Sequence, residues 1–268
     1  MQKISEILNS DIEKLDKCKY CGKTYQKHEY KIFEGMPEER IMRVQAPACD
    51  CLKRREEQEK VKIEAEEKKE KLTKLFENSL ITPYFQKKTF ENLQIKANEY
   101  GNEKELKKLL QYAQNFKKGE MPGIFLTGKP GTGKTSMIAA VSNELMQRGF
   151  NVLFVTFSAL MERFLKYSAE HNGDIYPLLM WLVKFDFVVI DDLGRENYTD
   201  RRKEIAYRII DTLLCYEVPT GFTANPEMIE RLRKIEDWNA ILDRLKDICG
   251  LAINFKGESI RGHKWQLA

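Results

Sequence analysis

The pattern of apolar and polar positions changes after residue 120. Beyond it, short apolar runs alternate with longer segments whose apolar residues recur every three or four positions. Such runs predict buried strands, and such segments predict amphipathic helices. We predict strands at 123–127, 151–157, 185–191, 221–224 and 251–255, and helices at 133–148, 158–170, 176–183, 199–216, 226–234 and 237–247. This alternation predicts an α/β fold with a parallel sheet covered on both faces.

The first 120 residues follow other patterns. Residues 1–17 carry apolar positions at helical spacing and predict a short amphipathic helix. Residues 52–78 are mostly Lys, Arg and Glu, often with Glu four positions before Lys, which is typical of a solvated helix. Residues 81–93 predict an irregular stretch rich in aromatic side chains, and 102–116 predict another helix. We therefore divide the chain into an N-terminal domain (1–52), a charged linker helix (53–79) and a larger domain (80–268).

Length and charge narrow the class of protein. A chain of 268 residues can form one sizeable core and a small second domain. Its 45 basic and 41 acidic residues give a formal net charge of +4, so any surface for nucleic acid must be local. The first residues lack the apolar core of a signal peptide, and no apolar run approaches the roughly 20 residues of a membrane helix. We expect a cytoplasmic protein that has no membrane partner.

Four of the six cysteines form two close pairs, Cys18-x-x-Cys21 and Cys49-x-Cys51. Without a secretion signal, such pairs indicate a metal site in a reducing compartment rather than disulfides. Thiolates two or three positions apart on a turn can share one tetrahedral Zn²⁺, so we predict a small N-terminal zinc-binding domain. His28 could replace one thiolate, and a reduced cluster without metal is the alternative.

The segment from Gly128 to Thr135 fits the pattern G-x-x-x-x-G-K-[ST]. It follows a predicted strand and opens a predicted helix, which is the setting of a phosphate-binding loop. Its glycines let backbone N–H groups surround a phosphate, Lys134 would reach the β- and γ-phosphates, and the Thr135 hydroxyl would hold Mg²⁺. We predict that a nucleoside triphosphate binds here, against Gly128, Pro130, Gly131, Thr132, Gly133, Lys134, Thr135 and Ser136.

An apolar run at 187–190 ends in Asp191 and Asp192. At the carboxyl end of a parallel strand, beside a phosphate-binding loop, such carboxylates face the ligand crevice. We predict that Asp191 binds Mg²⁺ with the nucleotide, and that Asp192 polarises the attacking water. The next predicted strand ends in Asn225, which could bind that water or the γ-phosphate. Asn225 could also cap the helix that follows.

Together these motifs resemble the DnaC/DnaI/IstB branch of the AAA+ ATPases. The residues that carry the resemblance are Gly128–Thr135, Ile190-Asp191-Asp192-Leu193-Gly194, Phe222–Asn225 and Asp243-Arg244-Leu245. The resemblance implies a P-loop AAA+ sheet with flanking helices, and an enzyme that hydrolyses ATP to ADP and phosphate at subunit interfaces. It also implies that Asn225 is the sensor 1 residue, Arg244 the arginine finger and Arg261 the sensor 2 residue. Because only residues 256–268 follow the last predicted strand, we expect a minimal helical lid.

The resemblance further implies a role in DNA replication. The N-terminal cysteines look like the zinc-bearing, helicase-binding domain of DnaI-type loaders. We therefore expect an ATP-dependent loader, bacterial or phage, that assembles on a hexameric replicative DNA helicase and places it on single-stranded DNA during replication initiation. One alternative is an IstB-like ATPase that assists a transposase and needs no zinc module. Another is a P-loop kinase for small molecules, for which we find no acceptor-binding residues.

Two groups of side chains could contact a ligand, although the helix after the second predicted strand could instead serve the core through Phe154, Leu160, Phe164 and Leu165, and the second group could itself be core. The first mixes aromatic and basic residues after the second predicted strand, as a surface for single-stranded DNA would: Phe157, Arg163, Lys166 and Tyr167. The second precedes the phosphate-binding loop and could flank the adenine: Tyr84, Phe85 and Phe90.

Overall fold

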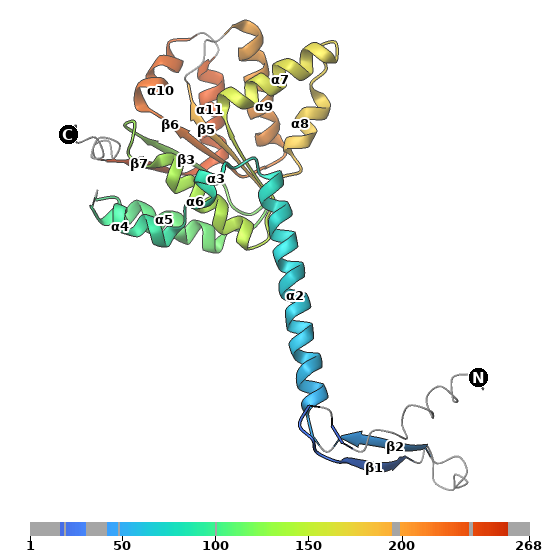
Figure 1. Ribbon diagram of the computed structural model, residues 1–268. Coiled ribbons are helices and arrows are strands. Elements are labelled where there is room, and N and C mark those ends of the chain that lie inside the picture. The colour runs from blue at the N-terminus through green and yellow to red at the C-terminus, as the bar shows by residue number, and fades with distance from the viewer. Residues whose placement is uncertain are drawn as a thin grey trace, which may run out of the picture. The chain divides into compact units, whose positions relative to one another are not determined.

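The computed structural model describes residues 17–18, 20–30, 42–47, 49–99, 101–194, 199–235 and 238–256 (Figure 1). The chain divides into two compact units, residues 1–69 and 70–268, and each is described by itself. The helix expected over 1–17 lies almost wholly outside the described residues. None of the helices in the described ranges is long and apolar enough to cross a membrane.

The N-terminal unit contains a β-hairpin that the sequence analysis did not anticipate. Strands β1 (Tyr25–Tyr30) and β2 (Met42–Pro47) pair antiparallel, with Tyr25 opposite Pro47 and Tyr30 opposite Met42. One cysteine pair precedes this hairpin and the other follows it. The antiparallel pairing therefore brings the two cysteine pairs to the same end of the hairpin.

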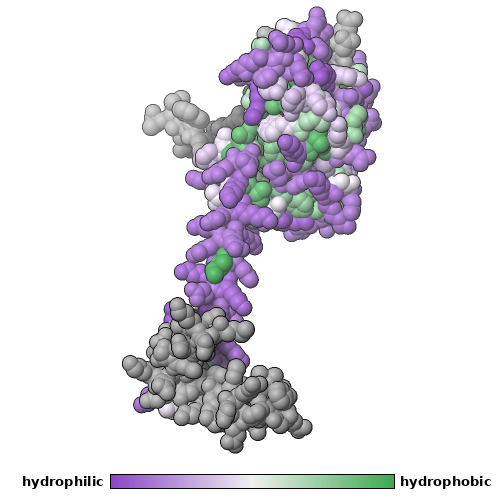
Figure 2. Space-filling view, turned by 90° about the vertical axis from the view of Figure 1, so that its right-hand side faces the viewer, coloured by the Kyte–Doolittle hydropathy of each residue, from purple (hydrophilic) through white to green (hydrophobic). Residues whose placement is uncertain are grey.

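The charged segment forms a helix, as its pattern predicts. Helix α2 spans Cys51–Asn78, and every side chain from 53 to 71 is exposed. Figure 2 shows its surface as hydrophilic almost throughout. Its function as a linker stays a prediction.

The larger unit is built on a parallel sheet of five strands. These are β3 (Gly123–Gly128), β4 (Val152–Thr156), β5 (Phe187–Leu193), β6 (Thr220–Ala224) and β7 (Cys249–Phe255). Their order is β4-β5-β6-β3-β7, and every described pairing is parallel. The predicted α/β sheet is thus confirmed. Because β6 lies between β3 and β5, the carboxyl ends of these three strands meet at one edge of the sheet.

Helices cover both faces of this sheet (Figure 1). One face packs against α5 (Glu103–Asn115) and α6 (Lys134–Gln147), with a core that includes Leu106, Phe116 and Ile138. The other face carries α7 (Phe157–Glu170), α8 (Tyr176–Leu182), α9 (Asp200–Cys215), α10 (Pro226–Arg233) and α11 (Trp238–Ile248). Its core includes Phe157, Ile209 and Trp238, all fully buried.

The stretch expected to be irregular, 81–93, contains a short helix and the start of a longer one. These are α3 (Pro83–Gln86) and α4 (Phe90–Glu99). Thr89 and Asn92 cap α4 reciprocally: the Thr89 N–H donates to Asn92 Oδ1 at 3.1 Å, and the Asn92 N–H donates to Thr89 Oγ1 at 3.3 Å. This is a capping box with Asn in place of the usual Glu or Gln, and it explains why the helix begins here.

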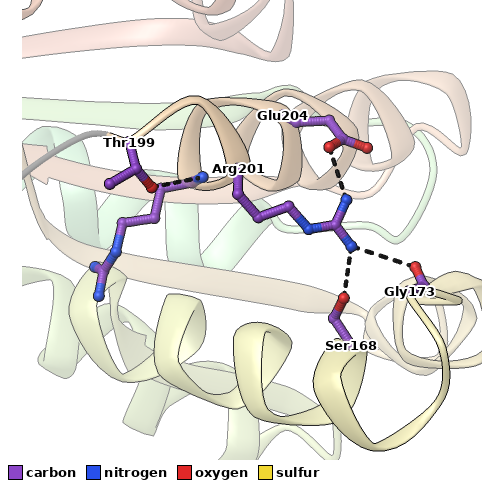
Figure 3. A network of polar contacts seen from close by, with 6 residues as sticks. Ser168, Gly173, Thr199, Arg201 and Glu204 are labelled. Atoms are coloured by element: carbon purple, nitrogen blue, oxygen red, sulfur yellow. Dashed lines mark hydrogen bonds and ion pairs between the residues drawn. The ribbon is translucent and has the colours of Figure 1, made fainter.

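The start of α9 is fixed by a polar network (Figure 3). Arg201 donates through Nη2 to Ser168 Oγ at 2.5 Å and to the Gly173 carbonyl at 3.4 Å, which joins α9 to the end of α7. Its Nη1 donates to Glu204 at 2.7 Å, and Thr199 caps the helix by accepting the Arg202 N–H. This network anchors the helix that begins a few residues after the acidic end of β5.

Candidate nucleotide-binding site

The phosphate-binding loop joins β3 to α6, as its motif predicts. Gly128 has a φ of 148°, and a Cβ there would lie 2.7 Å from the Phe255 carbonyl oxygen, so glycine is required. Gly133 has a φ of 94° and stands at the N-cap of α6. Between them, Thr132 Oγ1 donates to the Lys129 carbonyl at 2.9 Å and closes the turn. The result is a glycine-rich loop leading into a helix N-terminus, where anions bind well.

Lys134 lies inside this loop. Its ammonium group donates to the carbonyls of Gly128 at 2.7 Å and Lys129 at 2.9 Å, and to Asn225 Oδ1 at 2.9 Å. The side chain is 7% exposed. The lysine of the loop and the polar residue that follows β6 are therefore in direct contact.

Asp191 contacts the other side of the loop. Thr135 Oγ1 donates to Asp191 Oδ1 at 3.0 Å, and Thr223 Oγ1 donates to the same oxygen at 2.6 Å. Burial raises the pKa of Asp191, while the two hydroxyl groups and the charge of Lys134 act against that increase. A hydroxyl and a carboxylate oxygen at this separation are hard ligands that suit one Mg²⁺ ion.

Asp192 follows in an unusual backbone conformation. Its φ is 62°, and the pairing of β5 with β6 shifts between Ile190 and Leu193, where β5 holds one residue more than β6. A non-glycine residue in this region costs on the order of 1 kcal/mol or more. The Asp192 N–H donates to Thr223 Oγ1 at 2.9 Å, so a side chain compensates for the shifted backbone pairing. Bulges of this kind redirect side chains beside active sites.

The structure bears on both interpretations of Asn225. Its backbone occupies the N-cap position of α10, where its carbonyl accepts from the N–H groups of Met228 and Ile229. Its side chain makes no capping hydrogen bond and instead accepts from Lys134. One residue thus begins the helix through its backbone and faces the nucleotide site through its side chain.

Arg244 lies on α11 and is held by α9. Its Nε donates to Asp211 Oδ1 at 2.7 Å, its guanidinium lies 4.3 Å from the centre of the Tyr207 ring, and it also bonds the Tyr207 hydroxyl. The hydrogen bond to Asp211 raises the pKa of Arg244 above its ordinary value. The contacts that the structure shows for Arg244 are with α9 and its own helix, not with the phosphate-binding loop. Arg261 lies outside the described residues.

The structure places several of the aromatic and basic side chains that could contact a ligand. Phe157 and Phe90 are buried, whereas Tyr84 is 63% exposed and lies beneath the ammonium group of Lys88. Arg163 stacks on Trp181, and Tyr167 stacks on His171. Because Phe157 belongs to the core, the expected mixture of aromatic and basic side chains for DNA cannot include it.

The four N-terminal cysteines converge. The Sγ atoms of Cys18, Cys21, Cys49 and Cys51 all lie within 4.8 Å of one another. Sulfurs bound at about 2.3 Å to one tetrahedral Zn²⁺ would be about 3.8 Å apart, so the arrangement fits the ion. Backbone N–H groups of Tyr20 and Cys21 lower the pKa of the Cys18 thiol to about 7, whereas hydrogen bonds with the sulfurs of Cys21 and Cys49 raise the pKa of Cys51 to about 12. The side chain of His28 lies outside the described residues.

Comparison with known proteins places the larger unit in a family. The sequence profile described as "IstB-like ATP binding protein" matches residues 57–268. The chain belongs to this family. The predicted resemblance to the DnaC/DnaI/IstB branch is thereby confirmed.

Individual relatives of this IstB-like ATP-binding protein support the same family assignment. The "Replicative helicase loader DnaC" of Escherichia coli K12 is 30% identical over 199 residues, which are 74% of this chain and 79% of DnaC. The DnaC of Buchnera aphidicola subsp. Baizongia pistaciae is 29% identical over 71% of this chain and 76% of that protein. The crystal structure of DnaI matches with a TM-score of 0.55 and 22% identity, over 68% of this chain and 95% of that chain. AMPPCP-bound DnaA from Aquifex aeolicus matches with a TM-score of 0.51 and 20% identity, over 66% of this chain and 51% of that chain.

These matches divide the candidate residues of the IstB-like protein into two groups. The phosphate-binding loop, the two aspartates, Asn225 and Arg244 lie within the matched range, whereas the four cysteines precede residue 57. Sequence reasoning found the loop and the aspartates but missed Thr223, Tyr207 and Asp211. The one available signal for Thr223 was a hydroxyl residue near the carboxyl end of a predicted strand, two positions before Asn225.

Proposed function

We propose that this chain is an ATP-dependent loader that places a replicative DNA helicase on single-stranded DNA during replication initiation. The observation that carries the ATPase part is the convergence of Lys134 and Thr135 at the start of α6 with Asp191 of β5 and Asn225, which follows β6. Family membership supports ATP hydrolysis in general. The loader part is supported by the similarity to helicase loader DnaC over most of its length.

In the proposed mechanism, the residues of one subunit bind and position the nucleotide. Thr135 and Asp191 would hold Mg²⁺, which when bound neutralises charge on the β- and γ-phosphates. Lys134 would exchange its carbonyl partners and Asn225 for phosphate oxygens. Asp192 would then polarise the attacking water, and Asn225, released from the lysine, would orient it. The chemistry is thus positioning and electrostatic stabilisation, as in other phosphoryl transfers.

The site would be completed by a neighbouring subunit. Arg244 is partly exposed at 28% of its side chain and is oriented by α9. We assign it the role of an arginine finger that stabilises charge on the γ-phosphate of the next subunit. Arg261 would serve as the sensor 2 residue. Nucleotide binding would in this way be linked to assembly on the helicase.

The N-terminal region would supply the helicase contact. We propose a zinc-bound domain over 1–52 that grips the hexameric helicase, a linker helix over 53–79, and the ATPase domain over 80–268. The convergence of four sulfurs within 4.8 Å supports the zinc site. A chain with this role would work in the cytoplasm, where the replicative helicase acts.

Co-purification with the cognate replicative helicase tests the proposal. We expect tagged helicase to retain the wild-type chain and ATP to change the amount retained. Cys21→Ser should strongly reduce retention, whereas the matched Cys215→Ser, at an exposed cysteine outside the cluster, should not. A helicase that retains none of the wild-type chain, with or without ATP, would contradict the loader role.

A second candidate is an ATPase that assists a transposase, because the matching family profile is IstB-like. The four-cysteine cluster disfavours it, since that role needs no zinc module. Retention of the chain by a transposase and not by the helicase would favour this candidate.

A further inference from the structure

One buried side chain of the nucleotide site has no role in the mechanism above. Thr223 lies in β6 and is 1% exposed. Its Oγ1 donates to Asp191 Oδ1 at 2.6 Å and accepts the backbone N–H of Asp192 at 2.9 Å. A single hydroxyl group therefore binds the side chain of the first aspartate and the backbone of the second.

The backbone at this point explains why such a contact is needed. Between Ile190 and Leu193 the pairing of β5 with β6 shifts by one residue, and Asp192 has a φ of 62°. The shift takes the Asp192 N–H out of the regular strand pairing. A buried N–H without a partner is costly, so the Thr223 hydroxyl replaces the backbone acceptor.

The same hydroxyl also orients the carboxylate that faces the phosphate-binding loop. Asp191 Oδ1 accepts from Thr223 on one side and from Thr135 on the other. Without Thr223, the carboxylate would lose the shorter of these two hydrogen bonds, and the Asp192 N–H would lose its bond to the Thr223 hydroxyl.

We propose that Thr223 is a positioning residue for magnesium binding and ATP hydrolysis, which holds the Asp191–Asp192 bulge in its working conformation. This inference rests on the proposed ATPase function and deepens it. Thr223 touches neither nucleotide nor water in this mechanism; it acts through the two aspartates. Its loss should therefore reduce the gain in nucleotide affinity that Mg²⁺ provides, and it should slow hydrolysis. The affinity for the nucleotide without Mg²⁺ should stay largely unchanged.

Strand β6 offers a matched control. Thr220 is fully buried in the same strand, and its Oγ1 donates to the Val218 carbonyl at 2.8 Å, away from both aspartates. Thr220→Val removes a buried hydroxyl just as Thr223→Val does, but it leaves the bulge intact. Thr223→Ser keeps the hydroxyl and removes only the methyl group.

The test compares the full-length wild type with Thr223→Val, Thr223→Ser and Thr220→Val. For each protein, the Kd of a fluorescent ADP analogue is measured in excess Mg²⁺ and in EDTA, turnover is measured at saturating ATP, and the melting temperature is recorded. We expect Thr223→Val to reduce the gain in affinity from Mg²⁺ by about tenfold and turnover by about ten- to hundredfold, with Kd in EDTA unchanged. Thr223→Ser and Thr220→Val should stay within about threefold of the wild type in both quantities.

Three results would overturn the inference. In the first, Thr223→Val keeps the magnesium effect and the turnover of the wild type. In the second, Thr223→Ser is as impaired as Thr223→Val, which would assign the effect to packing of the methyl group. In the third, Thr220→Val is equally impaired, which would assign it to the loss of any buried hydroxyl in β6. A wild-type protein that binds no nucleotide would instead contradict the proposed ATPase function, and this inference would fall with it.

Discussion

The folds of the two units of this chain are stabilised by different interactions. The larger unit buries two apolar cores on opposite faces of a five-stranded sheet, so its fold rests on packing. The described part of the N-terminal unit holds a two-stranded hairpin and four converging cysteines. A two-stranded hairpin is marginal by itself in water, so a metal ion held by these cysteines would stabilise it. The larger unit should therefore tolerate chelators, and the smaller one should tolerate loss of nucleotide.

The largest effect should come from removing the lysine of the loop. Lys134→Ala removes a buried ammonium group that would meet the phosphates, and we expect turnover to fall by about 10³-fold or more. An exposed lysine outside the loop provides the control, because Lys117→Ala removes only a surface pair with Glu120 and should change turnover by less than about threefold. A phosphate-release assay measures both. Zinc content should be the same in all three proteins, and turnover that survives Lys134→Ala would contradict the site.

A smaller loss is expected from the residue proposed to act on a neighbouring subunit. Arg244→Ala should keep ATP affinity and reduce helicase-stimulated turnover by about 10²-fold or more. Mixing it with Lys134→Ala should partly restore activity, because each protein supplies what the other lacks. Lys246→Ala is the control, since Lys246 is an exposed residue of the same helix paired with Asp243. No recovery in the mixture, under conditions where subunits associate, would argue against a shared site.

Metal removal tests the smaller unit. We expect one zinc per chain by metal analysis, and we expect Cys21→Ser to lose it and to weaken helicase binding by about tenfold or more. The melting temperature of the larger unit should stay within about 2 °C of the wild type, because its cores contain none of these cysteines. Cys215→Ser should retain the metal. Full zinc content in Cys21→Ser would show that this thiolate is not a ligand.

The smallest effect concerns stability within the larger unit. Arg201→Ala removes the hydrogen bonds that tie α9 to Ser168 and Gly173, and should lower the free energy of unfolding by about 1–2 kcal/mol. Arg233→Ala breaks an exposed pair with Glu230 and should cost less than about 0.5 kcal/mol. Urea denaturation measures both. Equal losses would mean that the network in Figure 3 is no stronger than a surface ion pair.

Local patterns predicted most of the larger unit because most of its strands and helices carry a signal of their own. The predicted strand at 123–127 and the observed strand Gly123–Gly128 differ by one residue. Helix α4 was missed because its capping box uses Asn92, and the usual pattern has Glu or Gln at that position. Patterns along the chain predicted the candidate site, but they did not reveal which distant side chains contact it.

The supporting contacts could not be predicted because they join residues far apart in sequence. Thr223 meets Asp191 across 32 positions, and Arg244 meets Asp211 across 33. Each partner taken alone is an ordinary strand or helix residue. Only the order of the strands and the packing of α11 on α9 bring these pairs together.

Calorimetric titration with a non-hydrolysable ATP analogue tests the central claim most directly, namely that the loop and Asp191 bind one magnesium–nucleotide complex. The account predicts one site per chain, an affinity that Mg²⁺ increases by about tenfold or more in the wild type, and no such increase in Asp191→Asn. No heat with the wild type, or the same magnesium effect in Asp191→Asn, would contradict it.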